Sequence, residues 1–308
     1  MNKLRPLNII APRGPHQFAD LLIDSFARKG GVKIHSWDYR RQNTPWWEAL
    51  DQTAPTIVMR GNEFNVLPHV LEWLKGPRYL WYCEDIAHDR GTEIMKLACF
   101  YDDIWLHWLH PDVLHAIQAH FSRKRIRHMP ILYADKTVWT PGTGGAHWCE
   151  VLHYGELTPR REALLAGLKC EQMVTQKFDT LVIHEVQDKD HRRLAKYVQR
   201  SKSIINLHAW SPVNVEKRIA EAMMCGALVV TEALPVNGIP GELADPDSGL
   251  LWHVPAGNTG AMADAFELLC MGDWWKYWEE CAPKIRAYAE REFSHEKMAD
   301  DVASRIWD

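Results

Sequence analysis

Short apolar runs alternate with amphipathic stretches along almost the whole chain. The runs Leu7–Ala11 and Val32–Trp37 are short and apolar, as buried strands are. Between them, apolar residues over positions 18–26 recur at helical spacing and stop at Gly30. The same order of strand, loop and helix continues with short connections. Such alternation predicts a mostly parallel sheet with helices covering both of its faces.

The alternation lapses between about Thr137 and His147, where the sequence TVWTPGTGGAH has no apolar period. It resumes with predicted strands at Cys149–Tyr154 and Ser203–His208. We therefore expect an α/β protein of two Rossmann-like, doubly wound domains. The first covers residues 1–140, the second covers residues 148–285, and an amphipathic helix follows over 286–308. The carboxyl edges of the strands of such domains border a ligand-binding cleft.

Composition narrows the class of protein without naming an activity. Hydrophobic residues make up 46% of the chain and charged residues 25%, which is the balance of a globular protein in water. The first residues have one short apolar run, interrupted by Pro12 and Gly14, so we expect neither a signal peptide nor a membrane-spanning helix. The seven cysteines are scattered singly, which favours a reducing compartment and predicts a cytoplasmic protein.

The segment Ile204–Glu232 carries the most chemical information. A predicted strand ends at His208, a polar loop follows, and a helix over 215–225 then carries Lys217, Arg218 and Glu221. A loop-to-helix junction offers unpaired N–H groups to an anion. Arg218 and Glu221 are three residues apart and share a face of the helix. The cation suits a diphosphate and the carboxylate suits two ribose hydroxyls. An ordinary amphipathic helix with a surface ion pair, stopped by Gly226, is the competing interpretation.

The run RIAEAMMCGALVVT within this segment resembles the donor-site helix of the group 1 glycosyltransferases with a GT-B fold. The likeness is greatest to the branch that contains the spore-maturation CgeB-like proteins. VLHYGELTPRREALL at 151–165 and YLWYCED at 79–85 resemble further parts of that family. The resemblance implies a hexosyl- or pentosyltransferase that moves a sugar from a nucleotide-diphosphate sugar, with a UDP-sugar expected, to a hydroxyl acceptor. It implies no metal and no resident cofactor, and a last helix that returns to the first domain.

The resemblance also assigns roles to individual residues. Glu221 would hold the ribose, and three cations would neutralise the diphosphate. Gly155 would let the backbone approach the donor, and two residues at a strand end would line the cleft. The cations are Arg161, Lys217 and Arg218, and the strand-end residues are Asn206 and His208.

One position departs from the family. Many retaining members have a second glutamate eight residues before the one that matches Glu221, and Val213 stands there in this chain. The nearest carboxylate, Glu216, lies off that spacing. The stereochemical outcome, retention or inversion, therefore stays open.

An inverting reaction would need a general base in the first domain to reach the acceptor hydroxyl. Asp85 and His16 are the two candidates, and Asp85 is narrowly preferred because it ends a predicted strand at the expected edge. Glu84 and His88 are weaker alternatives.

Metal binding has little support in the sequence. Asp188-Lys189-Asp190 has the spelling of an Asp-x-Asp metal motif, but it precedes a helix and is better explained as its cap. Asp245-Pro246-Asp247 lies in a turn-rich loop. The histidines at 107, 110, 115 and 120 have no cysteine at a zinc spacing.

Two other functions remain open. One is a DNA glycosyltransferase of the phage type acting on a hydroxymethylated base, with modified DNA as acceptor. A net charge of −4 gives no general attraction to DNA, so this hypothesis depends on abundant aromatic residues and a local basic cluster. The other is a binding module that keeps the nucleotide-sugar site without catalysis. The basic cluster consists of Arg123, Lys124, Arg125 and Arg127.

Overall fold

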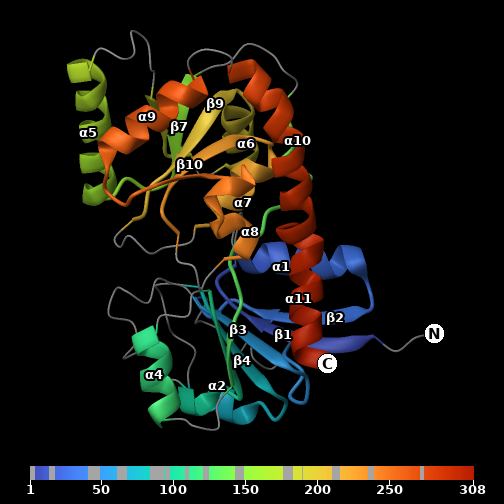
Figure 1. Ribbon diagram of the computed structural model, residues 1–308. Helices are drawn as coiled ribbons and strands as arrows, with labels where there is room; N and C mark the ends of the chain where they lie inside the picture. The colour runs from blue at the N-terminus through green and yellow to red at the C-terminus, as the bar shows by residue number, and fades with distance from the viewer. Residues whose placement is uncertain are drawn as a thin grey trace. The chain divides into compact units, whose positions relative to one another are not determined.

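The computed structural model describes residues 4–13, 18–40, 49–60, 68–83, 94, 98–107, 111–120, 125–142, 149–175, 183–188, 190–209, 216–234, 239–270 and 274–308. The chain forms two compact units, each with its own sheet (Figure 1). Unit 1 comprises Met1–Ile131 together with His295–Asp308, and unit 2 comprises Leu132–Ser294.

Unit 1 contains a six-stranded sheet in the order β2-β1-β3-β4-β5-β6. Every described strand pair in it is parallel, with Leu7 of β1 opposite Ile34 of β2 and Asn8 opposite Thr56 of β3. The strands are β1 (Arg5–Ile10), β2 (Val32–Trp37), β3 (Thr56–Arg60), β4 (Arg78–Tyr82), β5 (Asp103–Leu106) and β6 (Arg125–His128).

Helices of unit 1 bury apolar side chains on both faces of this sheet. Along β4, Trp81 meets the ring of Phe18 at 5.1 Å between centroids, whereas Leu80 belongs to the cluster that contains Leu71 of α2. Successive side chains of a strand point to opposite faces, so β4 contributes to two core layers. The helices of unit 1 are α1 (Phe18–Lys29), α2 (Pro68–Trp73), the 3-10 turn η3 (Ala98–Phe100), α4 (Pro111–His120) and α11 (His295–Trp307).

Unit 2 contains a five-stranded parallel sheet in the order β11-β10-β9-β7-β8. The residues of β9 and β10 are nearly all buried because both faces of the sheet are covered. The strands are β7 (Cys149–Tyr154), β8 (Ile183–Val186), β9 (Ser201–Asn206), β10 (Leu228–Glu232) and β11 (Trp252–Val254).

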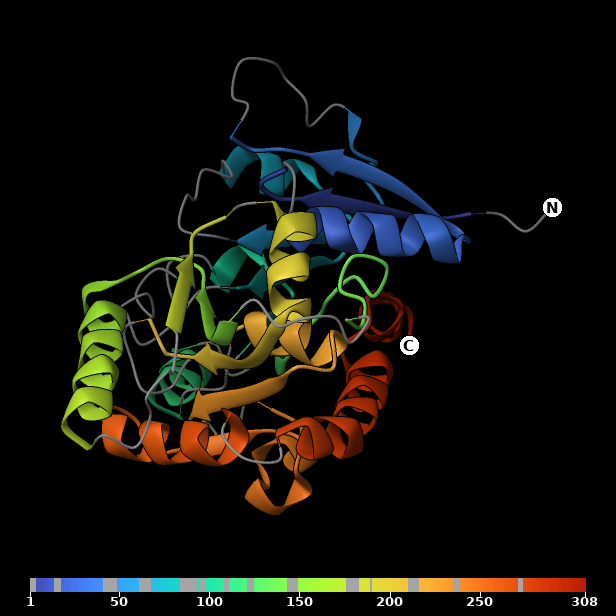
Figure 2. The ribbon, with the colours of Figure 1, turned by 90° about the horizontal axis from the view of Figure 1, so that it is seen from above.

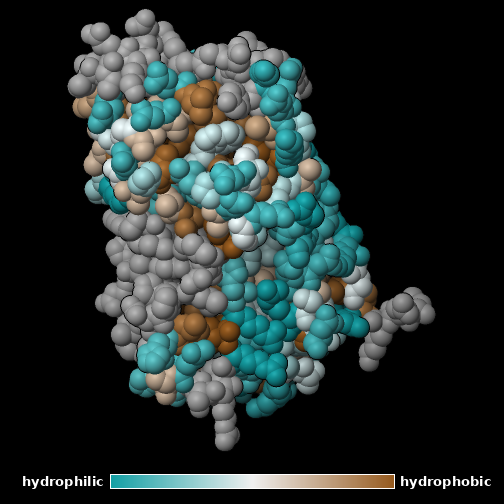
Figure 3. All heavy atoms as spheres, in the orientation of Figure 1, coloured by the Kyte–Doolittle hydropathy of each residue, from teal (hydrophilic) through white to brown (hydrophobic). Residues whose placement is uncertain are grey.

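The helices of unit 2 lie on both sides of its sheet (Figure 2). α5 packs against α9 on one side, and α7 packs against α10 on the other (Figure 1). In the view of Figure 3, α10 and α11 turn largely hydrophilic surfaces outward. The helices are α5 (Pro159–Thr175), α6 (His191–Gln199), α7 (Arg218–Met224), α8 (Gly241–Ala244), the 3-10 turn η5 (Pro246–Ser248), α9 (Thr259–Cys270) and α10 (Trp274–Glu292).

The predicted fold class, α/β with two parallel-sheet units, is confirmed. The limits of the units differ in detail from the sequence expectation of 1–140, 148–285 and 286–308. Unit 2 begins at Leu132 rather than after the turn-rich stretch, because Trp139 is buried and stacks on Tyr154 with 6.2 Å between ring centroids. The chain passes back to unit 1 at His295, and α11 then packs along α1.

Several local predictions are also confirmed. Asp190 caps α6, since its side chain accepts hydrogen bonds from the backbone N–H groups of Arg192 and Arg193. Asp245 caps η5 in the same way. Gly226 follows α7 with a φ of 71°, as expected for a residue that stops a helix. Among the described helices, none combines the length and the apolar character that crossing a bilayer requires.

Candidate functional site

The order of strands in unit 2 marks one place in its sheet where a ligand can enter. From β7 the chain passes first to β8 on one side and then to β9 on the other, so β7 and β9 are neighbours. Ligands of doubly wound sheets bind beyond the carboxyl ends of the strands at such a switch point. Here those ends are Tyr154 and Asn206. Charged side chains from three segments converge there.

Arg161, in the first turn of α5, extends across this switch point. Its Nε donates to the carbonyl oxygen of Leu207 just beyond β9, at 3.0 Å, and its Nη1 donates to the carbonyl oxygen of Glu156, at 2.7 Å. Only 3% of the residue is exposed. Burial lowers its pKa, partly offset by nearby Glu216, and an arginine so altered still carries its charge at neutral pH. Its guanidinium is therefore a fixed positive charge.

Arg218, the first residue of α7, brings a second guanidinium to the same point. Its Cζ lies 5.4 Å from the centre of the Tyr154 ring, within range of a cation–π contact. Its Nη1 lies 3.5 Å from Nε2 of His153 on β7, and 6% of the residue is exposed. α7 has seven residues and begins at Arg218, so it is shorter than the predicted helix over 215–225. The positive character of the site accordingly comes from side chains.

Glu216 joins the two arginines. One carboxylate oxygen accepts from Nη2 of Arg161, and the other lies 3.0 Å from Nη2 of Arg218. From the sequence, Glu216 was named only as a carboxylate off the family spacing, and no role was assigned to it. Its position two residues before Arg218, at the junction between strand and helix, is the signal that could have identified it.

His153 is neutral beside these cations. Burial, followed by the charges of Arg218 and Arg161, lowers the pKa of His153 to about 2. A guanidinium can only donate, so Nε2 of His153 accepts from Arg218 and the ring proton lies on Nδ1. The imidazole supports the guanidinium without adding to its charge.

Glu221, one turn further along α7, is 4% exposed and lies beside a second group of side chains. Its Oε2 is 3.4 Å from the hydroxyl of Tyr154, which is 3.0 Å from the carbonyl oxygen of Arg218. Its Oε1 is 3.4 Å from Nζ of Lys217 and 3.8 Å from Nδ1 of His191. Arg218 thus lies over the Tyr154 ring, and Glu221 lies beside the hydroxyl of the same residue.

Asn206 and His208 form their side-chain hydrogen bonds outside this cluster. Both are fully buried, and they bind protein groups: Nδ2 of Asn206 donates to Oγ1 of Thr231 at 3.0 Å, and Nε2 of His208 lies 3.1 Å from the carbonyl oxygen of Ala233. The neighbouring strand β10 and the residue after it supply these partners at the point where β9 ends. The expected place of both residues in a ligand cleft stays a prediction.

Gly155 adopts a backbone conformation that other residues avoid, with a φ of 108°. A Cβ atom added there would lie 2.5 Å from Nη2 of Arg218. The glycine therefore allows the guanidinium to lie against the backbone at the end of β7.

If this site holds the diphosphate of the nucleotide sugar that the sequence predicts, Gly155→Ala should weaken binding of UDP by about 10-fold, because the new methyl group moves the Arg218 guanidinium. Isothermal titration calorimetry measures this. Gly249→Ala is the matched control, since Gly249 has a φ of 70° and nothing lies within 4 Å of its added Cβ. The control should bind UDP as the unaltered protein does. Equal affinities for all three proteins would contradict the prediction.

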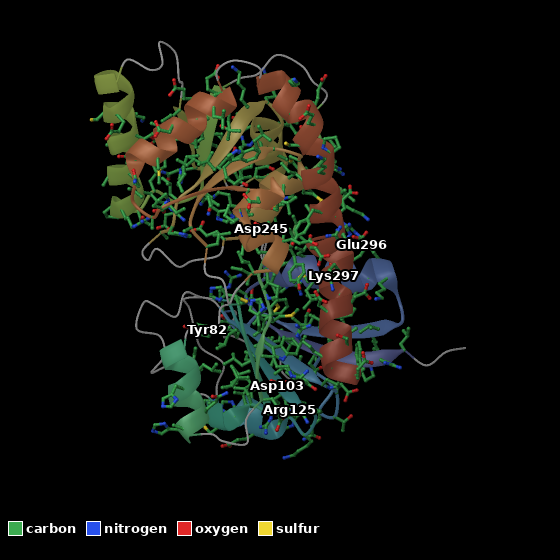
Figure 4. All side chains as sticks on the ribbon, viewed as in Figure 1. Tyr82, Asp103, Arg125, Asp245, Glu296 and Lys297 are labelled. Carbon is green, nitrogen blue, oxygen red and sulfur yellow. The ribbon has the colours of Figure 1, made fainter. Side chains whose placement is uncertain are left out.

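The candidate bases Asp85 and His16 lie outside the described residues, as do Val213, Glu84 and His88. Of the basic cluster, Arg123 and Lys124 are also outside. Arg125 lies on β6 near Asp103 of β5 (Figure 4), and Arg127 pairs with Asp103 at 3.0 Å. Within the described ranges, no group of three or more His, Cys, Asp or Glu residues is arranged to hold a metal ion.

No protein-family profile matches the sequence, and no curated protein is similar to it at the level of sequence. Solved structures do match. Sucrose-phosphate synthase from Thermosynechococcus elongatus aligns with a TM-score of 0.64 and 13% identity over 98% of both chains. A glycosyltransferase from Rickettsia africae aligns with a TM-score of 0.60 and 9% identity, also over 98% of both chains. The pneumococcal O-GlcNAc transferase GtfA, in complex with UDP and GlcNAc, aligns with a TM-score of 0.54 and 11% identity over 83% of this chain and 57% of its own. These likenesses show that the chain has the two-domain α/β fold of the GT-B glycosyltransferases.

Proposed function

We propose that the protein is a glycosyltransferase that moves a sugar from a nucleotide-diphosphate sugar to a hydroxyl group. The observation that carries this proposal is the convergence of two buried guanidinium groups, those of Arg161 and Arg218, at the switch point of unit 2. Two planar cations aimed at one carboxylate are matched to the oxygens of a phosphate group as well. The GT-B fold adds a scaffold on which such a donor site is expected.

The charges are suited to the bond that would break. As the bond between the anomeric carbon and the diphosphate oxygen breaks, negative charge grows on the leaving diphosphate. Arg161 and Arg218 are held by carbonyl groups, a neutral histidine and an aromatic ring, so little reorganisation is needed at that moment. Fixed cations of this kind stabilise the transition state more than the ground state. In this proposal they supply the charge that a divalent metal supplies elsewhere.

The acceptor oxygen would form the new bond to the anomeric carbon and release its proton. In an inverting reaction a base takes that proton, and Asp85 stays our preferred candidate, with His16 second. In a retaining reaction the departing diphosphate oxygen can take that proton, so no such base is needed from the first unit.

Glu221 would bind the ribose. Its carboxylate is buried, and Tyr154, Lys217 and His191 surround it without saturating the acceptor capacity of its two oxygens. Two vicinal hydroxyls can donate to one carboxylate. UDP is the first nucleotide to test, because the pneumococcal GtfA structure holds UDP.

We predict that Glu221→Gln weakens UDP binding about 10-fold and leaves inorganic pyrophosphate binding within about twofold, because only the nucleotide has a ribose. Calorimetry with both ligands separates the two contacts. Glu162→Gln, at a carboxylate in the first turn of α5, is the control and should change neither affinity. Loss of pyrophosphate binding in Glu221→Gln would contradict the ribose assignment.

A direct test of function uses a panel of UDP-, GDP- and CMP-linked sugars. A donor that binds the folded protein raises its melting temperature. Donor hydrolysis or transfer then separates an enzyme from a binding module. Binding without turnover under any acceptor condition would favour the module, and absence of any nucleotide-sugar binding would overturn the proposal.

A further inference from the structure

Glu216 occupies the position between Arg161 and Arg218 where an anion would be held. Its two carboxylate oxygens contact Nη2 of Arg161 and Nη2 of Arg218, the latter at 3.0 Å. In the described part of the chain, no other carboxylate is paired with both guanidinium groups. The separation of the two carboxylate oxygens is close to that of two non-bridging oxygens of a phosphate, which the same fork geometry recognises.

The surrounding charges explain why a carboxylate belongs there. Two buried guanidinium groups repel one another and lose the solvation of water, so they need an anion nearby. His153 accepts from Arg218 but is neutral. Arg161 binds two carbonyl oxygens, which are dipoles rather than charges. Glu216 is accordingly the counterion of the pair.

The side chain of Glu216 can leave without disturbing the fold around it. The residue precedes α7 and its carbonyl oxygen accepts from the N–H of Ile219 at 3.1 Å, so its backbone is anchored. Its side chain is 15% exposed, whereas those of Arg161 and Arg218 are 4% and 7% exposed. Rotation about side-chain bonds is enough to move the carboxylate toward water.

We propose that Glu216 is an internal competitor of the diphosphate for the Arg161–Arg218 pair. It keeps both guanidinium groups in place, and it must be displaced when the diphosphate binds. This inference rests on the proposed function, because it takes the arginine pair to be the diphosphate site. The proposal has an unusual consequence for a residue in a binding site. Removal of the Glu216 charge should lower the stability of the protein and raise its affinity for the diphosphate.

The test compares Glu216→Gln with the unaltered protein, using UDP and inorganic pyrophosphate as probes. Calorimetry should show about 10-fold tighter binding of both ligands, while the melting temperature without ligand falls. Glu162→Gln is the charge-matched control: Glu162 is exposed and follows Arg161 directly in the first turn of α5. The control should change either affinity by less than about twofold, because a solvent-exposed charge is screened.

The outcomes separate the two proposals. Unchanged or weaker binding in Glu216→Gln, with binding that still requires Arg218, would overturn the competitor role and leave the diphosphate site intact. Equal tightening in Glu162→Gln would also overturn it, since a general charge effect would then suffice. If neither probe binds the unaltered protein or Glu216→Gln, or if Arg218→Met binds both as well as the unaltered protein, the site assignment and the competitor role fail together.

Discussion

Replacing Arg218 with methionine should weaken binding of UDP and of inorganic pyrophosphate by about 10- to 100-fold. A charge-assisted hydrogen bond contributes about 1.5–3 kcal/mol, and each 1.4 kcal/mol is a factor of ten in affinity. The guanidinium of Arg218 is nearly buried and held by Glu216, His153 and the Tyr154 ring, so its position is set before a ligand arrives. Loss of this group removes half of the paired charge at the switch point.

Methionine is chosen because it keeps an unbranched apolar stem of similar length over the Tyr154 ring. Arg193→Met is the matched control: Arg193 also pairs with a carboxylate of unit 2, at 2.9 Å from Asp188, but its side chain is 64% exposed. We expect the control to bind both ligands normally. Circular dichroism verifies that each variant is folded. A folded Arg218→Met protein with undiminished affinity for both ligands would remove Arg218 from the site.

The second large effect concerns stability and centres on Glu232, the last residue of β10. This fully buried carboxylate accepts hydrogen bonds from the N–H of His208 at 2.7 Å and from that of Gly257 at 2.8 Å. Both terminal nitrogens of Arg160 also donate to it, at 2.8 and 2.5 Å. One carboxylate therefore ties together the ends of β9 and β10, the loop before α9, and the start of α5.

Glu232→Gln should lower the free energy of unfolding by about 3 kcal/mol, because an amide nitrogen cannot accept from these donors and the Arg160 charge loses its partner. Urea-induced unfolding measures the change. Glu185→Gln is the control, since Glu185 forms an exposed pair with Lys169 at 2.7 Å and should contribute less than about 1 kcal/mol. Equal destabilisation by both substitutions would contradict the role given to Glu232.

The contribution of Glu232 to stability should depend on pH, and the direction follows from its pKa. Burial alone would raise the pKa of Glu232, but the hydrogen bonds from Arg160, His208 and Gly257 outweigh it and the pKa is lowered. A lowered pKa in the folded state contributes stability that is complete at neutral pH and is lost as the pH falls through that pKa. The difference in stability between the unaltered protein and Glu232→Gln should therefore shrink on acidification below about pH 4. A difference that stays constant over this range would contradict the assignment.

Much of the fold follows from patterns that are local in the sequence. Strands and helices alternate, and the spacing of apolar residues distinguishes them without reference to distant parts of the chain. The start of unit 2 was harder to predict because it depends on a long-range contact. Trp139 lies in a stretch rich in glycine and proline, yet its ring stacks on that of Tyr154. No local pattern in the sequence predicts this contact.

The candidate site was predicted in part. Arg161, Arg218 and Glu221 were selected from the sequence, and Arg161 and Arg218 meet through Glu216. A family motif compares residues by their spacing along the chain. Glu216 bridges the two arginines because of where the segment before α7 lies in space, which spacing does not describe. Neighbouring residues of a helix point in directions about 100° apart. Arg160 therefore pairs with Glu232, whereas Arg161 pairs with Glu216. The sequence alone does not predict which of the two arginines belongs to the site.

The strand-end residues show a second limit of sequence reasoning. The family resemblance implies that Asn206 and His208 line a ligand cleft at the end of a strand. Such side chains are exposed or buried according to the hydrogen-bonding partners that neighbouring segments provide. Here Thr231 and Ala233 provide those partners. Burial of both residues follows from that pairing.

The return of the chain to unit 1 at His295 has a consequence for biosynthesis. Met298 and Val302 of α11 are fully buried, and Trp307 meets the ring of Phe26 at 6.3 Å. While the chain emerges from the ribosome, unit 2 is complete in one continuous stretch, whereas α1 waits for a partner encoded more than 260 codons later. Domains fold as units during synthesis, so unit 1 is made first but completed last, and the face of α1 that α11 covers is exposed to aggregation or chaperone capture in the interval.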